Sequence, residues 1–144
     1  MNYSDLKLEN QLCFPLYVCA REIVNAYRPF LDELGLTYTQ YIALMVLWEE
    51  KCITVKALGI KLHLDSGTLT PLLKKLESKG LIARERSSED ERIVFASITS
   101  EGMALREKAL TVPTQMANCV DGFSPEEAIE LRALLNKLMS ALKK

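Results

Sequence analysis

The sequence predicts a mainly α-helical domain that carries one β-hairpin. Apolar residues recur at helical spacing along most of the chain, whereas residues 81–98 hold two short runs of strand-forming residues around a charged turn. The chain has 144 residues, which suits a single domain over 1–144.

A long first helix is expected over 6–31, where apolar residues repeat every three or four positions and Pro29 lies near the end. Pro15 has no backbone N–H, so two arrangements stay open. Either the helix begins late, with Pro15 in its first turns, or it bends at Pro15.

A pair of helices is expected next. Thr37 and Gln40 have the spacing of a capping box, which opens a helix over about 38–49. A shorter helix is expected over 55–62.

After a tight turn, Asp65 or Ser66 can cap a helix over 66–79, which Gly80 ends. Its four leucines repeat at helical spacing and are expected to face the core.

The remaining elements are a hairpin and two helices. Strands are expected over 81–86 and 92–98, followed by a helix over 100–117. Ser124 then begins a Ser-Pro-Glu-Glu segment, which is typical of a helix start. The order of elements over about 38–99 is that of a winged helix-turn-helix, an arrangement that binds DNA.

Composition excludes several classes of protein. No apolar run reaches the ~18 residues of a membrane span, and the first thirty residues lack a signal-peptide pattern, so we expect a cytoplasmic protein without membrane contact. The four cysteines form no C-x-x-C pair and the chain has one histidine, so we expect no zinc site and no cofactor. Structural disulfides are not expected in a reducing cytosol.

The helix over 66–79 carries the expected DNA contacts. Small hydroxyl side chains and lysines near a helix start suit base edges and phosphates in a major groove. Pro71 lies among them, and we expect it in or near the first turns, where its missing N–H matters least. The candidate contacts are Ser66, Thr68, Thr70, Pro71, Lys74 and Lys75.

The hairpin tip offers a further contact, because Arg92 follows Asp90 by two residues. An arginine there can enter a minor groove, whose negative potential attracts it, and Asp90 can hold its side chain. Although the net charge of the chain is −1, residues 54–92 hold eight Lys/Arg and six Asp/Glu. These charges could also be merely solvated, but the order of elements favours DNA contact.

Cys13 lies early in the first helix, and Tyr17 and Tyr27 share its face, four and fourteen residues later. Tyr27 is about 21 Å from Cys13 along the axis, so the two meet only if two copies of the helix cross antiparallel. Tyrosine hydroxyls that donate to sulfur would favour the thiolate. The residues alone favour a packing role for Cys13, since free cysteines are usually buried.

The other candidates are weaker. Cys19 and Cys52 are expected to pack, whereas Cys119 is expected in a loop between helices and can serve as a resolving thiol. His63, beside the tight turn, is expected at the surface or in a cap.

Four motifs together resemble the MarR family of bacterial regulators, and within it the organic-hydroperoxide resistance branch. They are Leu12-Cys13-Phe14 with Tyr17, Leu36-Thr37-Tyr38-Thr39-Gln40-Tyr41, the segment 64–74, and Ser88-Glu89-Asp90-Glu91-Arg92. The resemblance covers residues 8–100 and, more loosely, the rest. It implies a homodimeric repressor of an inverted-repeat operator in double-stranded DNA, dimerised through helices at about 5–31 and 100–144.

The resemblance also implies roles for single residues. Cys13 matches the cysteine that an organic hydroperoxide oxidises to a sulfenic acid. Tyr27 and Tyr38 match tyrosines that bond this thiol across the dimer, and Tyr17 matches a third tyrosine nearby. In two-cysteine members a cysteine of the other subunit, here Cys119, then forms a disulfide, whereas one-cysteine members use a small external thiol.

Two other functions remain open. One is a regulator that binds a small phenolic ligand between its dimer helices while the cysteines stay idle. The other is a thiol peroxidase, but Cys13 has no Arg or Thr companion nearby to activate peroxide. We therefore do not expect an enzyme.

Overall fold

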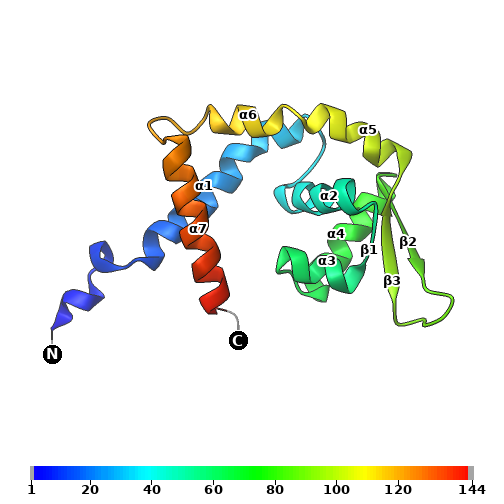
Figure 1. Cartoon of the computed structure of the whole chain (residues 1–144), viewed down its shortest axis with the longest axis horizontal. Coiled ribbons are helices and arrows are strands. Elements are labelled where there is room, and N and C mark those ends of the chain that lie inside the picture. The colour runs from blue at the N-terminus through cyan, green and yellow to red at the C-terminus, as the bar shows by residue number, and fades with distance from the viewer. Residues whose placement is uncertain (1, 143–144) are drawn as a thin grey trace.

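The computed structural model describes residues 2–142, which form helices around one small sheet (Figure 1). Two 3-10 turns precede the first α-helix, η1 (Tyr3–Leu6) and η2 (Leu8–Asn10). The α-helices are α1 (Cys13–Asp32), α2 (Tyr38–Glu50), α3 (Val55–Leu62), α4 (Ser66–Ser78), α5 (Ser100–Ala109), α6 (Val112–Ala117) and α7 (Pro125–Leu142). The strands are β1 (Cys52–Thr54), β2 (Ile82–Arg86) and β3 (Val94–Ile98).

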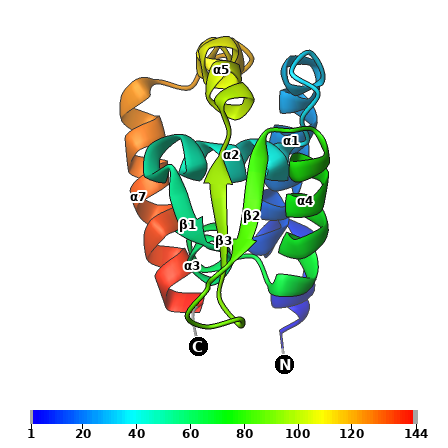
Figure 2. The ribbon, with the colours of Figure 1, turned by 90° about the vertical axis from the view of Figure 1, so that its right-hand side faces the viewer.

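The expected hairpin forms, but it belongs to a sheet of three strands rather than two. The order is β1-β3-β2 and both pairings are antiparallel, with Ala96 of the central strand opposite Ile53 on one side and Arg84 on the other. Figure 2 shows the three strands side by side, with the loop between β2 and β3 projecting at one end of the molecule. Strand β1 was not predicted, because three residues are too few to show an alternating pattern.

The core lies between the sheet and helices α2, α3 and α4. The four leucines expected to face inward from α4 are all buried: Leu69, Leu72, Leu73 and Leu76. Trp48 of α2 donates from its indole N–H to the carbonyl of Gly102 at 2.8 Å, which ties α5 to this core. The segments from α2 to β3 therefore form one packed head.

The expected helix caps are present. The Thr37 hydroxyl accepts from the N–H of Gln40 at 3.3 Å, and the Gln40 side chain accepts from the N–H of Thr37 at 3.1 Å. Asp65, rather than Ser66, is the N-cap residue of α4, and its carboxylate accepts from the N–H of Thr68 at 2.8 Å.

The expectation of one helix over 6–31 was wrong at its start. Residues 3–10 form the two 3-10 turns, and α1 begins at Cys13. Pro15 is therefore the third residue of α1, where a backbone N–H has no partner within the helix in any case. Of the two arrangements left open, the late start is the correct one.

Two further expectations need correction. The helix predicted over 100–117 is two helices, α5 and α6, which break at residues 110–111 just before Pro113. Pro71 lies inside α4 as its sixth residue, beyond the first turn. Its missing N–H thus removes a hydrogen bond to the carbonyl of Gly67.

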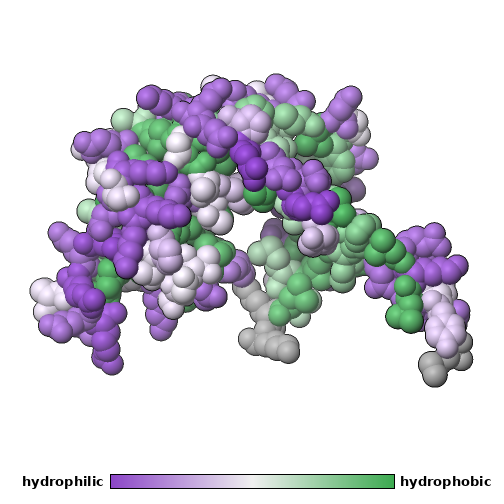
Figure 3. Space-filling model, turned by 180° about the vertical axis from the view of Figure 1, so that it is seen from behind, coloured by the Kyte–Doolittle hydropathy of each residue, from purple (hydrophilic) through white to green (hydrophobic). Residues whose placement is uncertain are grey.

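Helices α1 and α7 extend away from the head (Figure 1). Leu31 is the single buried residue of α1, and α7 has none among the described residues. Apolar surface gathers over these two helices (Figure 3). It includes exposed side chains of Leu12, Phe14, Ile23, Ile129, Leu131 and Leu134. No described helix is long and apolar enough to cross a membrane.

Candidate nucleic-acid interface and thiol site

A tight turn joins α3 to α4. His63 ends α3 in the left-handed conformation with φ of 53°, which makes it an exposed cap residue as expected. A Cβ atom at Gly59 would lie 2.9 Å from the carbonyl oxygen of Leu64, so only glycine allows this close approach. The turn fixes the angle at which α4 is presented.

The outer face of α4 carries the predicted DNA contacts. Ser66, Thr68, Pro71, Lys74 and Lys75 are exposed, and Thr70 is half-buried. All six lie on the helix that follows the turn, in the arrangement by which a helix-turn-helix enters a major groove.

Arg92 and Asp90 form the predicted pair at the tip of the hairpin. The Arg92 guanidinium donates to both carboxylate oxygens at 3.1 Å, and its backbone N–H donates to the same carboxylate at 3.1 Å. These hydrogen bonds lower the pKa of Asp90 below its ordinary value. The hydrogen bonds to Asp90 fix the direction of the Arg92 side chain, which remains 90% exposed to solvent.

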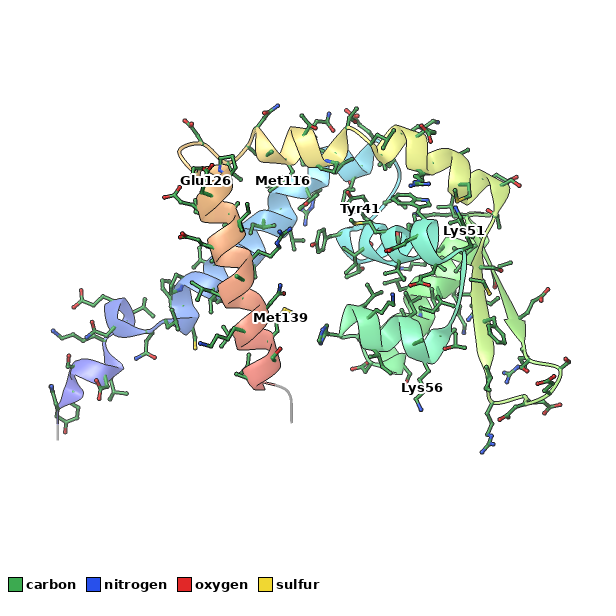
Figure 4. The ribbon with its side chains drawn as sticks, in the orientation of Figure 1. Tyr41, Lys51, Lys56, Met116, Glu126 and Met139 are labelled. Atoms are coloured by element: carbon green, nitrogen blue, oxygen red, sulfur yellow. The ribbon has the colours of Figure 1, made fainter. Side chains whose placement is uncertain are left out.

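An open groove lies between α3, α4 and the hairpin, and its volume is about 1220 Å³. Three cations that line it were not predicted as candidate contacts: Lys56, Arg84 and Arg86. The i, i+2 spacing of the two arginines would have placed them on one face of a strand. Figure 4 shows Lys56 pointing away from the head on the side of the hairpin tip.

Arg84 joins β2 to α4. Its backbone N–H donates to the Glu77 carboxylate at 3.0 Å and its guanidinium at 3.2 Å, which lowers the pKa of Glu77. On the same strand, the Arg86 guanidinium donates to the carbonyl of Glu91 at 2.9 Å and braces the hairpin loop. The position of the hairpin relative to α4 is thus set by directional bonds.

All four cysteines are exposed and free of disulfides. Cys13 is the first residue of α1. The expectation that Cys19 and Cys52 are packing residues is not met within one chain, because Cys19 lies on the uncovered α1 and Cys52 on the short edge strand β1. Cys119 follows α6, and its thiol donates to the carbonyl of Gln115 at 3.4 Å.

Three tyrosines gather where α1 ends and α2 begins. The ring of Tyr27 lies 5.0 Å from that of Tyr38 and 5.9 Å from that of Tyr41, measured between centroids. Burial, and then the neighbouring phenols, raise the pKa of Tyr27 above its ordinary value. Its hydroxyl therefore stays protonated, and able to donate, at physiological pH. Figure 4 marks Tyr41 at this junction.

Cys13 and the tyrosine cluster are far apart within one chain, because the cluster contacts α1 only through Tyr27. Cys13 is the first residue of the 20-residue helix α1 and Tyr27 the fifteenth, so they lie about 21 Å apart along the axis. Tyr17 is near Cys13 instead, exposed, with the Arg21 guanidinium 5.5 Å from its ring centre. One chain therefore does not bring Cys13 together with Tyr27 and Tyr38.

Within residues 2–142, no group of three or more His, Cys, Asp or Glu side chains is arranged to hold a metal ion.

Comparison with known proteins gives consistent results. Residues 25–109 match the family model of the transcriptional regulator SarA/Rot. The organic hydroperoxide resistance transcriptional regulator of Bacillus subtilis is 48% identical over 97% of this chain and 92% of its own length. Reduced AbfR bound to DNA superposes with a TM-score of 0.83 at 34% identity, over 99% of this chain and 96% of that chain.

AbfR, a protein of Staphylococcus epidermidis, is also known in a disulfide form. That form matches less closely, with a TM-score of 0.66 at 36% identity over 94% of each chain. The described conformation thus resembles the reduced, DNA-bound structure more than the disulfide structure. The related proteins named here are regulators, not enzymes.

Proposed function

Because the chain belongs to the MarR family of transcriptional regulators, in its organic-hydroperoxide resistance branch, we propose that it is a thiol-based repressor released from DNA by organic hydroperoxides. The observation that carries the proposal is the separation of Cys13 from the tyrosine cluster along an uncovered apolar helix. Such a site is complete only in a dimer, so its chemistry can act on the spacing between two DNA-binding heads.

The reduced dimer binds an inverted-repeat operator. Helix α4 of each subunit enters a major groove with Ser66, Thr68, Thr70, Pro71, Lys74 and Lys75. Arg92, held by Asp90, enters the flanking minor groove. The similarity to reduced AbfR bound to DNA supports this mode.

The dimer forms through α1, α7 and the segments beside them. Their exposed apolar side chains are the ones that a second copy would cover. An antiparallel crossing of two α1 helices brings Cys13 of one subunit to Tyr27 and Tyr38 of the other, with Tyr17 alongside. Hydroxyls that donate to the sulfur then stabilise the thiolate.

The Cys13 thiolate attacks the terminal oxygen of an organic hydroperoxide. The O–O bond breaks, the sulfur becomes a sulfenic acid, and the alkoxide leaves and takes up a proton as an alcohol. Exposed Leu12 and Phe14 flank the thiol and favour alkyl and lipid hydroperoxides over hydrogen peroxide.

A disulfide follows. The Cys119 thiolate of the other subunit attacks the sulfenic sulfur, an S–S bond forms, and hydroxide leaves to become water. Exposure of Cys119 in the loop after α6 supports this role. The disulfide displaces the helices that it joins and changes the distance between the two DNA-binding heads. This distance must match one helical turn of DNA, about 34–36 Å.

Intact mass spectrometry and a non-reducing gel test the chemistry. Reduced wild type, Cys13→Ser and Cys119→Ser are each treated with one equivalent of cumene hydroperoxide. We expect a covalent dimer in wild type only, and a sulfenic acid on Cys13 in Cys119→Ser. An adduct with a small thiol on Cys13 and no covalent dimer would assign a one-cysteine mechanism. Absence of any reaction at Cys13 would overturn the proposal in favour of a regulator that binds a phenolic ligand.

A further inference from the structure

Gln40 is a buried polar side chain, 3% exposed, in the first turn of α2. Its side-chain oxygen accepts two hydrogen bonds, from the backbone N–H of Thr37 at 3.1 Å and from Nζ of Lys79 at 3.2 Å. Tyr38 lies in the same turn, two residues earlier, and packs on Tyr27. The tyrosine cluster and Gln40 therefore move together if the start of α2 moves.

Lys79 reaches this turn from the DNA-binding helix. It is the C-cap residue of α4, and its backbone N–H donates to the carbonyl of Lys75 at 3.2 Å. Its ammonium group also donates to the carbonyl of Gly35, in the loop between α1 and α2. One cation thus joins that loop, the first turn of α2 and the last turn of α4.

The last turn of α4 also contacts the hairpin, because the Glu77 carboxylate accepts hydrogen bonds from Arg84 of β2. A displacement of this turn therefore reaches both DNA-binding parts of the head. Apolar packing between α2 and α4 is non-directional, whereas the hydrogen bonds that the Lys79 ammonium group donates weaken steeply when their geometry changes.

We propose that Lys79 is a positioning residue that couples the state of the tyrosine cluster to the placement of α4 on DNA. The proposal rests on the function proposed above, in which oxidation of Cys13 breaks tyrosine contacts across the dimer. A shift of Tyr38 moves Gln40 and the loop at Gly35, and Lys79 passes the movement to the end of α4.

The test compares operator affinity before and after oxidation. Wild type, Lys79→Met, Lys79→Arg and Lys108→Met are each oxidised with cumene hydroperoxide, and intact mass confirms equal oxidation at Cys13. Lys108 is an exposed lysine in the last turn of α5 and serves as the matched control. The readout is the ratio of the operator Kd of the oxidised protein to that of the reduced protein.

We expect Lys79→Met to lower this ratio by about fivefold or more, which is the lower range of couplings between sites. Lys79→Arg keeps a donor for both carbonyl oxygens and is expected to keep the ratio, as is Lys108→Met. A residue with a merely structural role would lower the unfolding midpoint or weaken both forms alike, and would leave the ratio unchanged.

Suppose that oxidation releases the wild-type protein from its operator, and that Lys79→Met has the same ratio of oxidised to reduced Kd as wild type. This result would overturn the coupling role of Lys79 but not the proposed function. Wild type that keeps its operator after oxidation of Cys13 would overturn the proposed function, and the coupling role with it. The two failures are therefore distinguishable from the wild-type measurement.

Discussion

At the scale of single residues, the proposed DNA-binding surface combines a hydrogen-bonded arginine with an exposed lysine. Arg92 is fixed by three hydrogen bonds to one carboxylate yet remains open to solvent. Lys74 is exposed on α4. A held arginine loses less side-chain freedom when it enters a narrow groove, whereas a free lysine contributes chiefly by neutralising phosphate.

Arg92→Ala is expected to weaken operator binding by about 1–3 kcal/mol, because it removes the proposed minor-groove contact. Fluorescence anisotropy with labelled operator measures the change. Arg106→Ala, at an exposed residue of α5, is the control. Equal affinities of Arg92→Ala and wild type would contradict the assignment of the hairpin tip.

Lys74→Ala is expected to weaken binding to all DNA sequences alike and to reduce the slope of log K against log salt by about 1. Anisotropy titrations at four salt concentrations give the slope. An unaltered slope would show that Lys74 does not neutralise a phosphate.

At the scale of elements, features that depend on residues close in the sequence were predicted correctly, whereas features that depend on distant residues were not. The capping box at Thr37 and the leucines of α4 depend on residues three or four apart, which the sequence displays directly. Strand β1 exists because Cys52 pairs with Ser97, a partner 45 positions away. In the same way, the exposure of Cys19 was not predicted, because the sequence does not reveal which face of α1 lacks a partner within the chain.

In the candidate site, too, contacts between residues close in the sequence were predicted and contacts between distant residues were not. Asp90 and Arg92 are two residues apart, and their pairing was predicted. Arg84 was missed because its partner Glu77 lies on the preceding element. The link from Lys79 to Gln40 spans 39 positions and has no motif. Contacts between distant segments depend on the packed head, so they become visible only in the structure.

Thr37→Ala is expected to destabilise the protein by about 1 kcal/mol, because it removes the hydroxyl that caps α2. Urea denaturation measures the free energy of unfolding. Thr111→Ala is the matched control, since Thr111 holds the N-cap position of α6 without a side-chain cap bond. The capping role would be refuted by equal losses in the two variants.

At the scale of the whole molecule, helices α1 and α7 extend from a packed head and have almost no buried residues within their own chain. Helix α7 is amphipathic, with exposed Leu131 and Leu134 and no buried residue among those described. Contiguous exposed apolar faces of this kind mark surfaces that another molecule covers. Under the function proposed above, a second copy covers these faces and completes the thiol site.

Leu134→Arg is expected to shift the protein from dimer to monomer, because it places a charge in the proposed apolar interface. Light scattering after size exclusion would give 16.2 kDa in place of twice that mass. Asn136→Arg introduces the same side chain on another face of α7 and is expected to leave the dimer intact. A dimeric Leu134→Arg protein would contradict the interface.

The most direct test of the central claim is operator affinity before and after oxidation. Reduced protein first selects its operator from random-sequence DNA, and binding is then titrated with and without one equivalent of cumene hydroperoxide. We expect oxidation to raise the wild-type Kd about fivefold or more and to leave that of Cys13→Ser unchanged. An unchanged wild-type Kd, or an equal rise in Cys13→Ser, would contradict a repressor controlled by the Cys13 thiol.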